Sequence, residues 1–406
     1  TKTSTKNKKT TKSKKIARKR TLLIVESPSK AKVIGKYLGP SYNVLASVGH
    51  VRDLPKSRLG IDIENQFEPG YINIRGKGDK IKELKKAPAS ASRVLLATDP
   101  DREGEAISWH LAYLLDIDPK SECRIVFNEI NKEAVKEAIK HPRSIDMGLV
   151  DAQQARRVLD RLVGYQISPL LWQKVRRGLS AGRVQSAALK MICDRENEIK
   201  SFVPEEYWTI TADYGDNFNA SLSKYNGEDI RITKAEEADA IEKQLSAGRF
   251  VVESVKTGKR KPKPYAPFTT SSLQQDASIK LNFQTKKTMQ IAQQLYEGID
   301  VKGIGTRGLI TYLRTDSVRI SSAAKEAASE FIANKFGKEY CSNNSFSNKN
   351  KDIQDAHEAI RPTDINLEPE AIRDSLTSDQ FKLYTLVWNR FVASQMSAAE
   401  FDTVTV

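Results

Sequence analysis

A tyrosine and an arginine stand two residues apart in the string GLITYLRTDS at 308–317. A free phenol is a poor nucleophile at neutral pH because its pKa is about 10. A neighbouring guanidinium favours the phenolate and neutralises charge that develops on a phosphate. On an extended backbone, Tyr312 and Arg314 share a face. The pair therefore predicts a tyrosine that attacks phosphate, although a core tyrosine beside a surface arginine would give the same two residues.

Three carboxylates follow an apolar run at 94–97, in the string TDPDREGE at 98–105. Asp99, Asp101 and Glu103 are spaced by two, and carboxylates crowded in this way repel one another unless a cation compensates. Such oxygen ligands suit Mg²⁺, which keeps several waters and bridges to phosphate. We therefore predict a magnesium site here. The alternative is an acidic turn that caps the next helix, where negative charge is favourable in any case.

A second charged group, ESPSK at 26–30, follows the apolar run at 22–25. It combines the carboxylate of Glu26 with the ammonium of Lys30. Near a phosphate, Glu26 could act as a general acid or base and Lys30 as a point charge. The alternative is a helix capped by Ser27 or Ser29, with Lys30 in solvent.

The elements that must position these groups are short strands alternating with helices. We expect strands at 22–25, 43–48, 94–97 and 124–127, and helices at 30–38, 105–115 and 132–140. This alternation predicts an α/β layer with a largely parallel sheet. Open sheets of this kind place their sites at the carboxyl ends of the strands, which is where both charged groups fall.

The rest of the chain mixes helical and strand patterns. Helical spacing begins at Asp151, is interrupted at Pro169, and returns at 183–197. Period-two alternation at 207–214 and 249–255 predicts antiparallel strands, and the basic, Pro-rich segment 256–267 predicts a connector. Ser271 and Gln274 resemble a capping box that opens a helix. Further helices are expected at 288–296, 323–334 and 378–394, with a polar loop at 342–351.

Composition indicates an intracellular protein of several domains. The formal charge is +15, but residues 1–20 carry ten Lys and Arg and no acidic residue, so this tail is expected to be disordered and to suit a polyanion. No run of about 18 apolar residues occurs, so no membrane helix is expected. The three cysteines form no C-x-x-C pair, which argues against zinc and disulfides. The first residue is not Met and 401–406 alternate like a strand, so we expect a part of a longer protein.

The two charged groups together carry a family resemblance. A strand that ends in Glu26 and a later strand followed by D-x-D-x-E resemble the Toprim domain, over roughly residues 21–145. Topoisomerases, bacterial primases and some nucleases share this domain. The resemblance implies Mg²⁺-dependent phosphoryl transfer, with Glu26, Asp99, Asp101 and Glu103 as metal ligands.

The tyrosine string resembles the active-site signature of type IA DNA topoisomerases, and a second block, DAHEAIRPT at 355–363, agrees with it. The resemblance implies that Tyr312 forms a transient 5′-phosphotyrosyl link and that Arg314 steadies the scissile phosphate, with Glu26 and Lys30 completing the catalytic set. His357 becomes a candidate phosphate contact, although it could equally be a structural histidine.

Two further blocks resemble the family's DNA-binding segments, QQARRVLDRLVGY at 153–165 and LSAGRVQS at 179–186. By this resemblance, Arg156, Arg183 and Gln185 contact the DNA backbone and Asp160 positions the strand; Ser180 and Arg361 belong to the same predicted DNA-binding set. Arg156 and Asp160 are four apart and face the same side of a helix, so a surface ion pair is the alternative.

The resemblance implies a multidomain toroid, built of α/β, helical and strand-rich parts. Its predicted parts are a basic tail (1–20), a Toprim domain (21–145), a helical single-strand-binding part (146–205), a strand-rich arch (206–270), a helical tyrosine domain (271–397) and a return into the arch (398–406). The implied activity is Mg²⁺-dependent relaxation of negatively supercoiled DNA by a cytoplasmic monomer. No G-x-x-x-x-G-K-[ST] string occurs, so no ATP site is indicated.

Two other functions stay open at the level of sequence. A Toprim nuclease or primase-like protein would use the same acidic cluster but would need no tyrosine. A single-strand-binding module without activity would fit if the chain cannot complete its groove. Within the topoisomerases, the run SVGHVRDLP at 47–55 and the basic tail favour the bacterial topoisomerase I type.

Overall fold

The computed structural model describes residues 20–215, 218–342, 344–347 and 357–406. The chain divides into two compact units. The first combines the residues up to Tyr165 with Lys263–Ala399, and the second combines Gln166–Pro262 with Glu400–Val406. Most of the predicted basic tail and much of the predicted loop at 342–351 lie outside the described residues.

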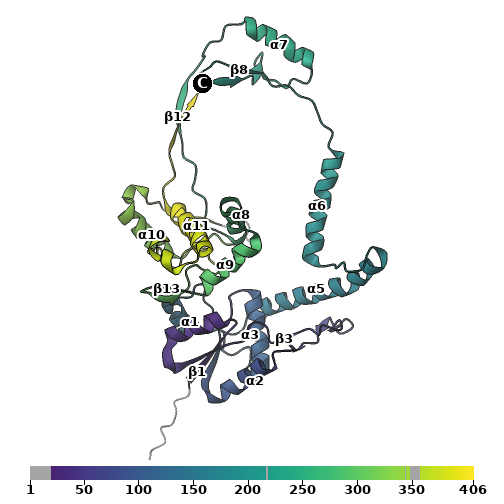
Figure 1. The fold of residues 1–406 in the computed structure, drawn as a ribbon, viewed down its shortest axis with the longest axis vertical. Coiled ribbons are helices and arrows are strands. Elements are labelled where there is room, and N and C mark those ends of the chain that lie inside the picture. Colours follow the sequence, from purple (N-terminus) through teal and green to yellow (C-terminus); the bar gives the residue numbers. More distant parts are fainter. Residues whose placement is uncertain (1–19, 216–217, 343, 348–356) are drawn as a thin grey trace, which may run out of the picture. The chain divides into compact units, whose positions relative to one another are not determined.

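A three-stranded parallel sheet forms the heart of the first unit (Figure 1). Its order is β2 (Tyr42–Ala46), β1 (Arg20–Val25) and β7 (Ala91–Leu96). The central strand β1 is apolar without alternation because both of its faces are covered. Leu23 and Val25 pack into one hydrophobic core, whereas Leu22 and Ile24 pack into another.

Helices cover this sheet, and most begin within a few residues of their predicted starts. They are α1 (Pro28–Leu38), α2 (Gly78–Lys86), α3 (Arg102–Leu115) and α4 (Lys132–Lys140). Val33 and Ile34 of α1 enter the first core, and Ile107 and Leu111 of α3 enter the second. Short strand pairs join β3 (Arg52–Asp53) to β6 (Ile72–Asn73) and β4 (Ile61–Asp62) to β5 (Glu68–Pro69).

Of the strand predicted at 124–127, Arg124 alone forms β-bridges. Arg124 forms a parallel bridge with Leu96 and an antiparallel bridge with Arg143. Because its buried guanidinium turns back to the carbonyls of Leu96 and Thr98, the segment leaves the sheet after a single pairing.

Two long helices follow. Helix α5 (Met147–Lys174) runs through Pro169, so the predicted interruption there is wrong. A proline lacks only one helical donor, and a helix can continue past it with a kink or a water at the freed carbonyl. Helix α6 (Arg183–Ser201) agrees with the predicted second helix.

The second unit contains three of the antiparallel strand pairs among the described residues. Strand β8 (Thr211–Asp213) pairs with β9 (Asn219–Ser221), and β10 (Lys224–Tyr225) with β11 (Glu228–Asp229). Helix α7 (Ala235–Ala247) packs Ala238 and Ile241 against Ile232. The strand predicted at 249–255 lies instead in β12 (Lys256–Arg260), inside the predicted connector, because β12 pairs with β15 (Phe401–Thr405) from the end of the chain.

Helices return in the second half of the first unit. They are α8 (Thr270–Leu281), α9 (Thr285–Glu297), α10 (Ser322–Lys335) and α11 (Ser378–Gln395), with a small pair of strands, β13 (Ile299–Val301) and β14 (Gly305–Arg307). The capping box of α8 is formed by Thr269 and Ser272 rather than by Ser271 and Gln274. Short 3₁₀ turns lie at Gly39–Ser41, Ala87–Ser90, Lys338–Tyr340 and Glu370–Ser375.

The fold class agrees with the prediction of a Toprim-like parallel layer joined to helical and strand-rich parts. Among the described residues, every helix is too short or too polar to cross a membrane.

Candidate active site

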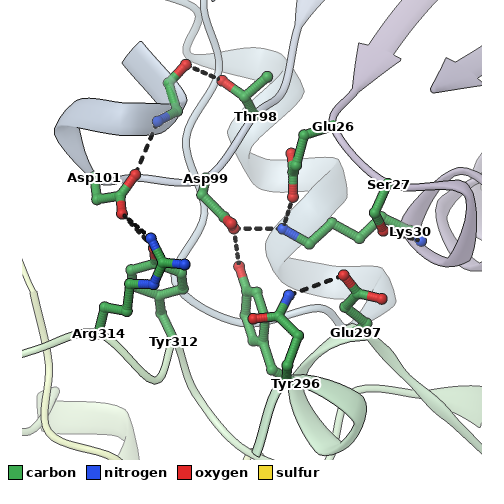
Figure 2. Close-up of polar contacts among 12 residues, drawn as sticks. Glu26, Ser27, Lys30, Thr98, Asp99, Asp101, Tyr296, Glu297, Tyr312 and Arg314 are labelled. Carbon is green, nitrogen blue, oxygen red and sulfur yellow. Dashed lines mark hydrogen bonds and ion pairs between the residues drawn. The ribbon is translucent and has the colours of Figure 1, made fainter. Parts of the chain in front are cut away.

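Glu26 and Lys30 are positioned by the turn between β1 and α1. Ser27 caps α1 by accepting a hydrogen bond from the backbone N–H of Lys30 at 3.2 Å, and Pro28 occupies the first helical turn. The Lys30 side chain folds back under this cap and is 1% exposed. Its ammonium donates to both Glu26 and Asp99 (Figure 2). The capping interpretation is therefore correct for Ser27, but Lys30 is buried rather than solvated.

Burial and charge act in opposite directions on this pair. Burial raises the pKa of Glu26 to about 7, partly offset by Lys30 and reinforced by Asp99. Burial alone would lower the pKa of Lys30, but the adjacent carboxylates of Asp99 and Glu26 outweigh it and raise that pKa. Lys30 therefore stays charged, while Glu26 can exchange a proton near neutral pH.

The acidic loop between β7 and α3 is held from behind by a buried arginine. Arg124 donates to the carbonyl oxygens of Thr98 at 2.7 Å and Asp99 at 2.6 Å, and Glu105 pairs with the same guanidinium at 3.0 Å. Gly104 allows the close approach, because a Cβ there would lie 2.1 Å from the carbonyl oxygen of Asp99.

The two carboxylate oxygens of Asp101 accept hydrogen bonds from different groups. Oδ1 accepts from the backbone N–H of Gly104 at 2.8 Å and caps α3. Oδ2 accepts from the hydroxyl of Tyr312 at 2.8 Å and from the guanidinium of Arg314 at 3.3 Å (Figure 2). The helix cap considered for this loop is therefore formed by Asp101, which also contacts Tyr312 and Arg314.

Tyr312 is fixed by its backbone as well as by its hydroxyl. Its N–H donates to the carbonyl of Asn128 at 2.8 Å, and its side chain is 3% exposed. Burial, together with Asp99 and Asp101, raises the pKa of the Tyr312 hydroxyl well above its ordinary value, and Arg314 lowers it only in part. The guanidinium alone therefore does not produce a phenolate, and the Tyr312 hydroxyl keeps its proton in this arrangement.

The four predicted metal ligands are not gathered into one set. Lys30 lies between Glu26 and Asp99, and Asp101 is engaged by Tyr312 and Arg314. Glu103 turns the other way, accepting from Gln153 at 3.1 Å beside His50 at 3.4 Å. No group of three or more His, Cys, Asp or Glu is placed to hold a metal ion within the described ranges. These side chains, as arranged, do not fit Mg²⁺.

Sequence reasoning missed Tyr296, at the end of α9. Its hydroxyl donates to Asp99 at 3.3 Å, and the Lys30 ammonium lies 4.7 Å from the centre of its ring. The ring also packs edge-on against Tyr312, with 5.3 Å between centroids. In the sequence, Tyr296 reads as an apolar position of a helix, and nothing near it marks a site.

The chain matches two protein-family models and a solved structure. The model of a DNA topoisomerase family matches residues 144–406, and the model of the Toprim domain matches residues 21–130. The chain belongs to the type IA DNA topoisomerases. It is similar to full-length topoisomerase I from Thermotoga maritima, with 46% sequence identity and a TM-score of 0.82. The match covers 94% of this chain and 62% of the length of the Thermotoga protein.

The second signature block of this topoisomerase chain is described from His357 onward. The His357 ring lies 5.9 Å from the Tyr312 ring, and its buried Nδ1 has no hydrogen-bond partner. Burial lowers the pKa of His357, against the opposing effect of Asp101. A neutral imidazole therefore borders the tyrosine, close enough to contact a phosphate that reaches it.

Arg361 is turned into the protein rather than outward. It is 5% exposed and pairs with Glu358 at 2.8 Å and with Glu129 at 3.4 Å. As placed, its guanidinium ties the tyrosine segment to the Toprim part. A DNA contact by Arg361 would require it to exchange these partners.

Arg156 and Asp160 line the same cavity, of about 310 Å³, beside the acidic loop, as their spacing predicts. The other lining residues belong to α3, α5 and the β3–β6 region: His50, Arg52, Asp53, Tyr71, Glu103, His110, Gln153 and Arg157. The lining therefore combines three arginines with three carboxylates, those of Asp53, Glu103 and Asp160.

Ser180, Arg183 and Gln185 lie in the second unit, at the start of α6. Gln185 donates to the backbone carbonyl of Ser180 at 2.5 Å, and Ser168 accepts from the N–H of Ala181 at 3.0 Å. These contacts order the loop before the helix. Gly182 caps α6 without a side chain, which leaves the amino end of the helix open to an anion.

Proposed function

We propose that this chain cuts and rejoins one strand of DNA by transesterification at Tyr312, and so relaxes negatively supercoiled DNA without ATP. One observation carries the proposal. Oδ2 of Asp101 accepts hydrogen bonds from the Tyr312 hydroxyl at 2.8 Å and from the Arg314 guanidinium at 3.3 Å. This arrangement supports a proposal in which Tyr312 is the nucleophile, Asp101 the proton acceptor and Arg314 the cation for the phosphate.

In the cleavage step, the Tyr312 oxygen bonds to the phosphorus of one DNA phosphodiester. Its proton passes to Asp101, to which it already donates. The bond from phosphorus to the 3′ oxygen breaks, which leaves a 5′-phosphotyrosyl link. Arg314 is 61% exposed, so its guanidinium can move from Asp101 to the phosphate oxygens as charge develops on them.

The departing 3′ oxygen must gain a proton. Glu26 is the group suited to supply it, because burial holds its pKa at about 7. Lys30 adds positive charge beside the leaving oxygen. Religation reverses both transfers, and one phosphate ester replaces another of similar energy. The cycle therefore needs no ATP, and none of the chain's strings resembles a P-loop.

The partner we propose is a single-stranded segment of negatively supercoiled duplex. In the first unit, we propose that Arg156 and Asp160, beside the acidic loop, contact this strand. In the second unit, we propose separate contacts from Ser180, Arg183 and Gln185 around the amino end of α6. Contacts through backbone charge and base stacking give little sequence preference. We expect a second strand to pass when the parts of the protein separate, as gated domain motions allow.

Magnesium stays a prediction. Toprim domains typically bind Mg²⁺, but here Lys30 already neutralises Glu26 and Asp99. Binding would require Asp101 and Glu103 to leave their present partners. None of the proposed cleavage and religation steps uses the ion.

The deciding experiment uses the 406-residue chain, a labelled single-stranded oligonucleotide and denaturing gels. Tyr312→Phe should abolish the covalent adduct that the wild type forms. Tyr384→Phe is the matched control, since Tyr384 is also buried and donates to the carbonyl of Leu367 at 2.8 Å. An adduct that survives Tyr312→Phe contradicts the proposal. Cleavage without an adduct would support a Toprim nuclease, and binding without cleavage would support a single-strand-binding module.

A further inference from the structure

Tyr296 is a second buried tyrosine beside the nucleophile, and its contacts differ from those of an ordinary core tyrosine. Tyr384, equally buried, donates to a backbone carbonyl. Tyr296 donates instead to the side chain of Asp99, at 3.3 Å, and its ring lies under the Lys30 ammonium. Tyr296 thus contacts Lys30, Asp99 and Tyr312, and all four residues are drawn in Figure 2.

The backbone fixes Tyr296 to the segment that carries the nucleophile. The N–H of Leu309 donates to the carbonyl of Leu295 at 2.7 Å. Gly308 packs so closely that a Cβ would lie 2.6 Å from the carbonyl oxygen of Tyr296. The position of the Tyr296 hydroxyl is therefore set by the same element that sets Tyr312.

Asp99 and Lys30, by contrast, belong to the Toprim part: Asp99 follows β7, and Lys30 lies in the first turn of α1. Lys30 holds Glu26 and Asp99 together, but it is long and belongs to the same part of the fold, so it cannot align them with Tyr312. Tyr296 lies at the end of α9, in the helical part (271–397) that also carries Tyr312. Among the described side-chain hydrogen bonds of Asp99 and Lys30, the one from Tyr296 to Asp99 reaches this part.

We propose that Tyr296 is a positioning residue for strand cleavage: its hydroxyl and ring hold the Glu26–Lys30–Asp99 group in register with Tyr312. This inference rests on the proposed function. It assigns Tyr296 no contact with DNA, so its loss should slow cleavage without weakening binding of the strand.

The test compares Tyr296→Phe with Tyr384→Phe, each of which removes one buried hydroxyl and keeps the ring. We expect Tyr296→Phe to lower the single-turnover rate of adduct formation about tenfold, as for loss of one hydrogen bond to a charged group. Affinity for the same oligonucleotide should stay within about twofold, because a positioning contact acts on the transition state and not on ground-state binding. Tyr384→Phe should leave both quantities near the wild-type values, although its thermal midpoint falls by a similar amount.

A double variant separates positioning from general packing. If Tyr296 acts through Asp99, then Tyr296→Phe should cost little further rate in an Asp99→Asn background. An equal factor in both backgrounds, or equal rates in the two Phe variants, overturns the inference and leaves the proposed function standing. No adduct in the wild type overturns both. Tyr296→Leu, which also removes the ring, should be slower than Tyr296→Phe, and an equal rate would contradict the role given to the ring.

Discussion

The hydroxyl of Tyr312 lies 2.8 Å from Oδ2 of Asp101, although the two residues are 211 positions apart in the chain. The contact joins the tyrosine segment to the first turn of α3. Because Oδ1 of Asp101 is occupied by the helix cap, only Oδ2 faces the nucleophile. This geometry supports the proposal that Asp101 accepts the proton, a role that its place in the acidic string did not reveal.

Asp101→Asn should therefore slow adduct formation by about 10²–10⁴, the range typical of a lost general base. Asparagine caps helices as well as aspartate does, so the fold should keep its stability. Single-turnover cleavage and thermal unfolding, measured on the same sample, check both statements. A rate within a few fold of wild type would remove Asp101 from the proton path.

Glu26 gives the reaction a pH dependence of known sign. Its pKa is raised to about 7, so the protonated acid is present below that pH and is lost above it. If Glu26 protonates the leaving oxygen, the cleavage rate should fall as pH rises through 7. Glu26→Gln should be slow at every pH and lack this step. A wild-type profile without a step between pH 6 and 8 would contradict the assignment.

The buried pair of Arg124 and Glu105 supports the acidic loop. Both side chains are 0% exposed. Arg124→Ala removes the buried partner of Glu105 and the hydrogen bonds to the carbonyls of Leu96, Thr98, Asp99 and Ile125, so it should lower the free energy of unfolding by about 3–5 kcal/mol. The matched control is Arg143→Ala, because Arg143 pairs with the same Glu105 but is 41% exposed; its loss should cost about 1 kcal/mol or less. Urea unfolding measures both, and equal losses would contradict the structural role given to Arg124.

The sequence predicted the sheet and the charged groups well, because each relied on local signals. Apolar runs gave β1 and β7, and the charges after them fell at the strand ends as parallel sheets require. The sequence-based prediction failed where contacts between distant parts of the chain determine the structure. Strand β12 forms only because the last residues of the chain pair with it, and Tyr296 matters only because folding brings Asp99 to it.

The magnesium prediction did not take into account the ammonium group of Lys30. Four carboxylates in sequence suggested a metal, whereas a lysine side chain occupies the space between two of them. No local pattern could show that Lys30 turns inward, since its burial depends on Asp99 arriving from a strand 69 residues away.

Replacing this lysine should expose the competition between ammonium and metal. Lys30→Met keeps the length of the side chain and removes the charge, which leaves Glu26 and Asp99 facing each other. Two such carboxylates repel unless a cation joins them, so the variant should bind Mg²⁺ more tightly than the wild type, by about tenfold or more. Calorimetric titration with Mg²⁺ measures this, and Lys36→Met is the control, because Lys36 lies on the same helix and donates to the hydroxyl of Thr306 at 2.8 Å. An unchanged affinity in Lys30→Met would mean that the ion binds elsewhere and that Lys30 does not compete with it.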